Sequence, residues 1–210
     1  MRLTILGATG GVGKHLVAHA LRDGHEVTAA VRNPDRLPVR DDNLTVLRVD
    51  PLDAGSLEQA VAGADAVLSG IGAAGRRDPL KPASSSARAA VEAMSATGVR
   101  RILVVSAGPL NRSGTGQPAF ARLLSPVLWA VLREVYTDLE AMERVLRESG
   151  LDWTSVRPPR LLDQPGRGTY RSAVDAGPVG GSIPRADVAR AMLDLIGRED
   201  TVGHAVGVAS

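Results

Sequence analysis

The feature of the sequence that most constrains the fold is a turn with glycines at every third position. The turn follows the apolar run of residues 2–6 and reads Gly7-Ala8-Thr9-Gly10-Gly11-Val12-Gly13. A strand, a glycine turn and a helix in this order form the first unit of dinucleotide-binding α/β folds. We expect Gly7 to permit the tight turn, Gly10 to let the backbone approach a diphosphate, and Gly13 to let the helix pack closely on the strand.

The amino end of the helix after this turn is suited to phosphate, because it carries unpaired backbone N–H groups and the positive end of the helix dipole. The alternative is a turn that binds nothing, since 23 glycines among 210 residues make a chance match easy. The position of the turn between a strand and a helix favours binding. We therefore expect Thr9, Gly11 and Val12, together with the three spaced glycines, to hold the diphosphate of a dinucleotide.

Short apolar runs alternate with amphipathic stretches over the first two thirds of the chain. This alternation is typical of a parallel sheet covered by crossover helices. The predicted strands are residues 2–6, 26–31, 44–49, 65–69, 101–106 and 152–156, and the predicted helices are residues 11–22, 56–62, 82–96 and 126–149.

The last third of the chain is less regular. Residues 160–181 are rich in glycine, proline and arginine, which predicts an irregular excursion before a helix at 185–196 and a final strand at 205–208. The length suits one domain, and no linker or repeat divides it. We therefore predict a single Rossmann-type α/β domain over residues 1–210, a doubly wound parallel sheet with a short carboxy-terminal elaboration.

Composition excludes several classes of function. The chain has 25 basic and 23 acidic residues, so its net charge of +2 gives no reason to expect nucleic acid or an acidic membrane as partner. It has no cysteine, which excludes disulfides, thiolate metal sites and a cysteine nucleophile. No apolar run suits a signal peptide or approaches the roughly 20 residues of a spanning helix. We expect a cytoplasmic protein, a monomer or small homo-oligomer, acting on a small molecule.

The histidines do not predict a metal site. His15 and His19 lie one helical turn apart beside the glycine turn, but no acid accompanies them. We therefore expect no bound metal.

The residue at the end of the second predicted strand decides which dinucleotide is preferred. An NAD enzyme places an acid there, about 20 residues beyond the glycine turn, to hold the ribose hydroxyls. This sequence has Arg32 instead, and Arg36 follows in the loop. The guanidinium fork fits a 2′-phosphate, although a solvated surface arginine is the alternative in an arginine-rich chain. We expect NADP(H) to be preferred over NAD(H).

Further motifs follow the glycine turn through nearly the whole chain. They read Val31-Arg32-Asn33-Pro34, Asp50-Pro51-Leu52-Asp53, Val104-Val105-Ser106, Ser149-Gly150-Leu151-Asp152-Trp153-Thr154, Arg157-Pro158-Pro159 and Ile183-Pro184-Arg185-Ala186-Asp187-Val188-Ala189. In this order they resemble the atypical short-chain dehydrogenase/reductase superfamily, in particular the small NAD(P)H-binding group that includes flavin reductase/biliverdin-IXβ reductase.

The resemblance implies roles for several of these residues. Asp50 and Leu52 would border the adenine. The residues after the fourth strand, Ser69, Gly70 and Ile71, would follow the adenosine ribose and the diphosphate.

On the nicotinamide side the resemblance implies that Ser106 and Pro158 line the pocket. Two acids have structural alternatives: Asp50 as the start of a turn before Pro51, and Asp187 as a first-turn helix acid. We favour binding for Asp50 and a structural role for Asp187.

Ordinary members of the superfamily use a tyrosine and a lysine four positions later, which lowers the pKa of the phenol. Here Tyr136 is followed at that spacing by Glu140, and Tyr170 by Val174. Neither tyrosine therefore has the lysine, so the dyad is absent. Glu140 cannot replace the lysine, because a carboxylate raises the pKa of a nearby phenol. Tyr136 and Ser106 remain the candidate catalytic residues, with helix packing favoured over catalysis for Tyr136. Ser106 lacks evident histidine and acid partners, which disfavours hydrolase chemistry.

Two classes of function stay open. The favoured one is an NADPH-dependent reductase that passes a hydride to a conjugated acceptor, such as a flavin, quinone or carbonyl. The other is a redox sensor that binds NADP(H) without turnover; a sugar epimerase or dehydratase is weaker, since those relatives usually keep the dyad.

We expect the substrate to meet two loops, residues 111–125 and 157–183. Apolar side chains could form the wall of the acceptor pocket, although core packing is an equal alternative for the last of them: Phe120, Leu123, Leu124 and Trp129.

Overall fold

The computed structural model describes residues 1–72, 75, 77–110, 129–177 and 180–210. Its main sheet is formed by β1 (Arg2–Leu6), β2 (Glu26–Val31), β3 (Leu44–Arg48), β4 (Ala66–Ser69), β5 (Arg101–Val105), β6 (Asp152–Arg157), β8 (Arg171–Val174) and β10 (His204–Ala209). The strand order is β3-β2-β1-β4-β5-β6-β10-β8. Neighbouring strands pair in parallel, except that β8 runs antiparallel to β10 at the edge.

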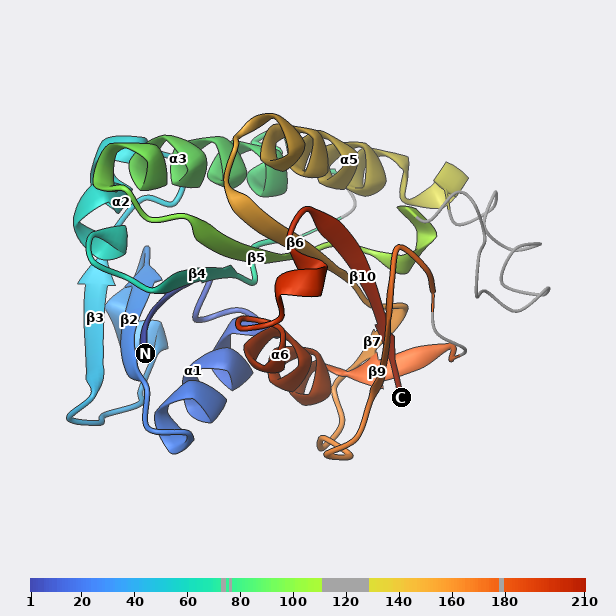
Figure 1. Ribbon diagram of the computed structural model, residues 1–210, viewed down its shortest axis with the longest axis horizontal. Coiled ribbons are helices and arrows are strands. Elements are labelled where there is room, and N and C mark those ends of the chain that lie inside the picture. Colours follow the sequence, from blue (N-terminus) through green and yellow to red (C-terminus); the bar gives the residue numbers. More distant parts are fainter. Residues whose placement is uncertain (73–74, 76, 111–128, 178–179) are drawn as a thin grey trace.

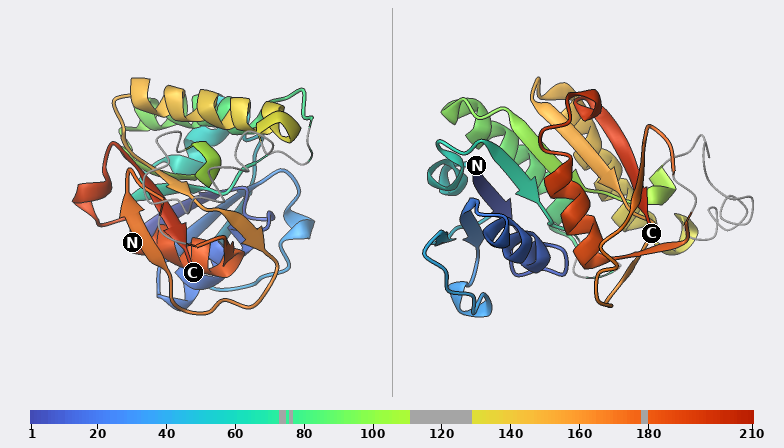
Figure 2. Two further views of the ribbon diagram at one scale, coloured as in Figure 1. Left: turned by 90° about the vertical axis from the view of Figure 1, so that its right-hand side faces the viewer. Right: turned by 60° about the horizontal axis from the view of Figure 1, so that its bottom comes forward.

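Helices cover both faces of this sheet (Figure 1). The longer helices of the described residues are α1 (Gly13–Arg22), α2 (Ala54–Val61), α3 (Pro82–Thr97), α5 (Arg133–Glu148) and α6 (Arg185–Asp194). On one face α3 packs against both α2 and α5, and on the other α1 packs against α6. The right-hand view of Figure 2 shows α1 and α6 side by side in front of the strands. The doubly wound α/β prediction is therefore confirmed.

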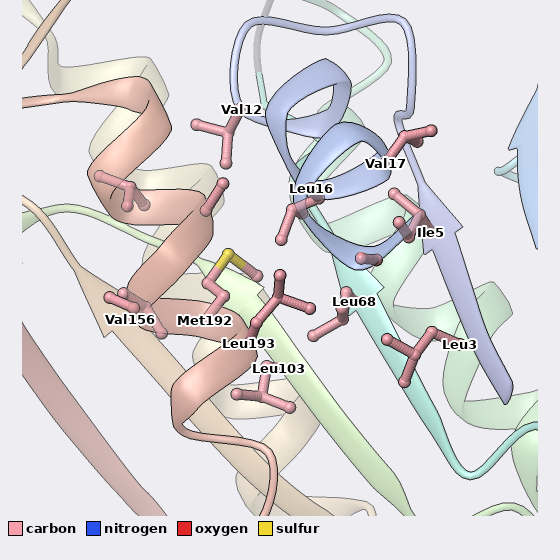
Figure 3. Packing of buried hydrophobic residues seen from close by; sticks show 14 of the residues in the cluster. Leu3, Ile5, Val12, Leu16, Val17, Leu68, Leu103, Val156, Met192 and Leu193 are labelled. Carbon is pink, nitrogen blue, oxygen red and sulfur yellow. The ribbon is translucent and has the colours of Figure 1, made fainter. Parts of the chain in front are cut away.

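The sheet divides the core into two clusters because successive residues of a strand point to opposite faces. In β5, Leu103 packs toward α1 and α6, whereas Ile102 packs toward the other helices. Figure 3 shows the first cluster, in which Leu16 of α1 lies near Met192 of α6 over Leu68 of β4. The central strands are buried on both faces and mostly apolar, which explains why the sequence pattern predicted them; Thr4, Ser69, Thr154 and Ser155 are the buried polar residues within them.

The predicted helix over residues 126–149 is wrong in one respect. Residues before 129 lie outside the described part, and the described part contains a helical turn at 129–131 that stops at Leu132. Leu132 has φ −112° and ψ 25°, and α5 begins after it. The rings of Trp129 and Tyr136, on either side of this break, are in contact with their centroids 5.1 Å apart.

The predicted irregular excursion over residues 160–181 is also partly wrong. It contains β8 and the short strand β7 (Arg160–Leu162), which pairs in parallel with β9 (Ser182–Pro184). Both strands depend on partners distant in sequence, so local composition did not reveal them. No described helix is long and apolar enough to cross a membrane.

Candidate cofactor-binding site

The sequence-predicted site residues follow the carboxyl ends of successive parallel strands. Because the strands are parallel, these ends meet at one edge of the sheet, and the strand order changes direction there between β1 and β4. A crevice at such a switch point is where open α/β sheets bind ligands. The residues gathered along this edge are Gly7, Arg32, Asp50, Gly70, Ser106 and Pro158.

The glycine turn has the geometry expected of it. Gly7 has φ +72°, a conformation that favours glycine, and its carbonyl oxygen accepts a 2.8 Å hydrogen bond from the N–H of Gly10. A Cβ on Gly13 would lie 2.0 Å from that same oxygen, so position 13 has no space for a side chain. Gly7 and Gly13 thus have the backbone geometry that the predicted roles require, and their contact with a dinucleotide stays a prediction.

The turn also has the chemistry that a diphosphate needs. The N–H groups of Gly11 and Val12 meet no acceptor within the described part of the chain. The first turn of α1 carries no acid. On the β4 side Gly70 closes against the turn, because a Cβ there would lie 3.2 Å from the nitrogen of Gly13. Free N–H groups at a helix amino end, in a cradle too tight for side chains, fit a dinucleotide diphosphate.

The two arginines predicted to meet a 2′-phosphate are open to solvent. Arg32 follows β2, and Arg36 ends the short helix Pro34–Arg36, whose start is capped by Asn33 accepting a 3.0 Å hydrogen bond from the N–H of Asp35. Both arginines are exposed, and neither has an ion-pair partner among the described residues. The loop is held in place while both guanidinium groups stay free for an anion.

Asp50 has the structural role that was the alternative to adenine binding, because it starts the turn before Pro51. Its Oδ1 accepts a 3.0 Å hydrogen bond from the N–H of Leu52, and its own N–H donates to Ser56 Oγ at 2.9 Å. These bonds shape the turn after β3. The Asp50 side chain is exposed at the site edge, so contact with adenine stays a prediction. After β4, the buried Ser69 accepts a hydrogen bond from the N–H of Ile71 at 3.4 Å, which shapes the next turn.

Ser106, the predicted nicotinamide-side residue, is bound to a buried carboxylate. Its hydroxyl donates a 2.8 Å hydrogen bond to Oε1 of Glu143, on α5. Its N–H donates to the carbonyl of Val156 at 2.7 Å, and the N–H of Gly108 donates to the carbonyl of Pro158 at 2.7 Å. These bonds join the ends of β5 and β6. The Ser106 hydroxyl therefore donates its only hydrogen bond to Glu143, and its oxygen can still accept a hydrogen bond from a ligand.

Glu143 is a residue of the candidate site that the sequence interpretation missed. It is 2% exposed, and it also accepts hydrogen bonds from Ser155 Oγ at 2.7 Å and Arg157 Nε at 2.9 Å. Burial alone would raise the pKa of Glu143, but Arg157 and the two serine hydroxyls lower it below its usual value. One sequence signal existed: Glu143 falls on the apolar stripe that includes Leu139 and Leu146.

Tyr136 lies in the core rather than in a proton-transfer arrangement. It is 6% exposed, and its ring packs against the indole of Trp129. The indole N–H of Trp129 donates to the carbonyl of Pro109 at 3.2 Å, which ties this pair to the segment after β5. Burial raises the pKa of Tyr136, so the phenol stays protonated.

The carboxy-terminal elaboration is fastened to α6. Asp187 is 2% exposed and accepts hydrogen bonds from the N–H groups of Arg167 at 2.9 Å and Gly168 at 3.1 Å. Tyr170 donates to Oδ2 of Asp194 at 2.7 Å, and burial together with Asp194 raises the pKa of Tyr170. Asp187 thus has a structural role. The other predicted substrate loop, residues 111–125 with Phe120, Leu123 and Leu124, lies outside the described residues.

A cavity of about 230 Å³ opens at the amino ends of β1 and β2, lined by residues such as Arg2, Thr4 and Glu26. It is at the opposite edge of the sheet from the glycine turn. In the described part of the chain, no three histidine, aspartate or glutamate side chains gather as metal ligands would.

Fold and glycine turn together define a dinucleotide-binding Rossmann protein. The sequence matches the NAD(P)H-binding family over residues 7–199. The chain belongs to that family.

Curated relatives differ in length. YhfK of Bacillus subtilis, an uncharacterised sugar epimerase, is 26% identical over 212 residues, covering 98% of this chain and 92% of YhfK. Three mycobacterial relatives are 29% identical over 158 residues, but the match covers 75% of this chain and only 14% of theirs.

Solved structures establish the fold. A short-chain dehydrogenase/reductase from Veillonella parvula in complex with NADP superposes with a TM-score of 0.83 at 24% identity, covering 100% of this chain and 94% of that one. SP1627 of Streptococcus pneumoniae, a proposed NADH-flavin reductase, superposes with a TM-score of 0.82 at 24% identity, covering 100% and 99%.

Proposed function

We propose that the protein is an NADPH-dependent oxidoreductase that reduces a small conjugated acceptor such as a flavin, a quinone or a conjugated carbonyl. The observation that carries the proposal is the state of the two candidate proton donors. The Ser106 hydroxyl already donates its hydrogen bond to Glu143, and Tyr136 is buried, with Glu140 at the position where a lysine would be needed. Such a site favours an acceptor that needs little acid catalysis from the protein.

The chain's own contribution is binding and orientation. The glycine turn holds the diphosphate, Arg32 and Arg36 hold the 2′-phosphate, and the joined ends of β5 and β6 border the nicotinamide. When bound, the reduced nicotinamide supplies the hydride. The Ser106 hydroxyl, with lone pairs free, would accept a hydrogen bond from an N–H donor of the cofactor or substrate.

Two of the related structures support this proposal, one by its bound cofactor and the other by its proposed activity. One is in complex with NADP, and the other is a proposed NADH-flavin reductase. The relative YhfK is named as a sugar epimerase, which would favour epimerisation of a sugar instead of reduction. We give it less weight because this chain has no lysine four positions after either tyrosine.

The test is to follow NADPH absorbance with a panel of flavins, quinones and conjugated carbonyls, with each acceptor also run without protein. Turnover that depends on the protein and saturates with one acceptor class would support the reductase. Tight NADPH binding without turnover of any acceptor would instead favour the redox sensor.

Gly10→Val should abolish cofactor binding, a loss of roughly a hundredfold or more in affinity, while the protein stays folded. A Cβ at position 10 would lie 3.1 Å from the oxygen of Gly7, which a small backbone shift can relieve, but the branched side chain would occupy diphosphate space. Gly197→Val is the matched control, since nothing lies within 4 Å of a Cβ there. Titration of NADPH onto both folded variants checks this; equal affinities would remove the cofactor role of the turn.

Tyr136→Phe should retain most of any reductase activity. The phenol is buried and protonated, and no lysine activates it, so the hydroxyl should contribute little to proton transfer. Steady-state rates of the wild type and the variant provide the measurement. A fall of about a hundredfold in kcat, the lower end of general acid catalysis, with an unchanged melting temperature would show that Tyr136 donates a proton.

A further inference from the structure

Arg185, the first residue of α6, lies over the glycine turn. A Cβ built on Gly11 would lie 2.6 Å from Nε and 2.7 Å from Cδ of Arg185, which is closer than real side-chain contacts. A residue with a side chain at position 11 would therefore displace Arg185. The missing side chain lets this guanidinium group approach the backbone of the turn, and Arg185 itself is only a quarter exposed.

The guanidinium group of Arg185 also has an acidic partner, and that partner is easily replaced. Its Nη1 lies 2.7 Å from Oδ1 of Asp163, and the Asp163 side chain is 78% exposed. Ion pairs with so exposed a partner contribute little to stability, because water and salt screen them. The segment that carries Asp163 does not depend on this pair, since Asp187 holds the N–H groups of Arg167 and Gly168.

The turn beneath Arg185 needs positive charge when it is loaded. The N–H groups of Gly11 and Val12 meet no acceptor within the residues that the structure describes. A helix amino end supplies only about half a unit of positive charge, whereas a diphosphate carries a negative charge on each phosphate. A guanidinium group can supply the missing positive charge, because its planar fork forms paired, charge-assisted hydrogen bonds with phosphate oxygens.

We propose that Arg185 binds the diphosphate of the dinucleotide and gives up Asp163 to do so. The inference rests on the cofactor role of the glycine turn and adds a side chain to it. The diphosphate is common to NADPH and NADH, so Arg185 acts on both cofactors alike. Arg32, at the ribose end, acts on NADPH alone.

The first experiment measures the affinities of NADPH and NADH for the wild type, for Arg185→Gln and for Arg190→Gln. Arg185→Gln should weaken both cofactors by about the same factor, tenfold or more, as the loss of a charged hydrogen bond predicts. Arg190→Gln is the matched control: it also removes an ion-paired arginine from α6, but its partners are Asp23 and Asp194. It should change neither affinity by more than about twofold.

The second experiment separates binding from support of the fold. Asp163→Asn changes an exposed residue and frees Arg185, so both affinities should stay equal to the wild type or rise up to about fivefold. If Arg185 only positioned the segment through Asp163, then Asp163→Asn and Arg185→Gln would weaken binding alike, and this result would overturn the inference.

The remaining outcomes are distinguishable. Undiminished NADPH and NADH affinity in a folded Arg185→Gln variant would overturn this inference and leave the proposed function standing. A wild-type protein that binds neither cofactor would overturn both. Equal wild-type affinities for NADPH and NADH would remove only the proposed preference, and an equal loss of both in Arg185→Gln would still support the Arg185 contact.

Discussion

Glu143→Gln should lower the free energy of unfolding by about 3 to 5 kcal/mol, the usual cost of breaking a buried ion pair by removing one partner. Glu143 is 2% exposed and accepts hydrogen bonds from Ser106, Ser155 and Arg157. Glutamine keeps the shape but not the charge. The Arg157 guanidinium, with its side chain 17% exposed, would lose the carboxylate that compensates it.

Chemical denaturation of the wild type, Glu143→Gln and Glu148→Gln measures this effect. Glu148 is an exposed residue near the end of the same helix, so its substitution should change stability by no more than about 0.5 kcal/mol. For a chain of this size the loss in Glu143→Gln corresponds to a melting temperature roughly 6 to 20 °C lower. A difference of less than 1 kcal/mol between the two variants, at about the precision of such fits, would mean that the cluster contributes little.

The same variant should show a defined pH dependence. The pKa of Glu143 is lowered in the folded protein, so its contribution to stability is present above the ordinary carboxyl pKa and is lost as the pH falls through the folded value. The stability difference between wild type and Glu143→Gln should therefore be full at neutral pH and shrink below about pH 4.3. A difference that grows on acidification would contradict the assigned charge state.

Arg32→Ala should weaken NADPH binding by about 10- to 150-fold and leave NADH binding nearly unchanged. The fold change corresponds to about 1.5 to 3 kcal/mol for a charged hydrogen bond, at 1.4 kcal/mol for each factor of ten. Arg32 stands at the carboxyl end of β2, beside the ribose in this fold. Its guanidinium group is exposed and pairs with no acid among the described residues, so no internal partner competes with the phosphate.

Equilibrium titration with both cofactors provides the measurement. Arg36→Ala should give a smaller loss for NADPH, because Arg36 sits farther along the loop. Arg40→Ala removes another exposed arginine beyond it and serves as the control for net charge. The loss in Arg32→Ala should shrink at high salt, which weakens the wild-type contact. Equal wild-type dissociation constants would refute the preference, and undiminished NADPH affinity in Arg32→Ala would refute the assignment to this residue.

The sequence by itself determined the order of the elements over the first two thirds of the chain and the edge of the sheet at which the candidate site lies. Strands buried on both faces leave short, mostly apolar runs, and the glycine spacing of residues 7–13 is a local requirement of one turn. Both signals lie within short stretches of chain. Parallel pairing then gathers the carboxyl ends of the strands, so the edge where Gly7, Arg32 and Ser106 meet follows from the element order alone.

Only the tertiary structure decided which side chains complete that edge. Ser106 and Glu143 lie 37 residues apart, and Arg185 meets Gly11 from the far end of the chain. The pairing of β8 with β10 depends equally on a partner distant in sequence. Hydrophobic period and turn chemistry specify local conformation, but the partner of a buried carboxylate or an edge strand depends on how separate elements pack.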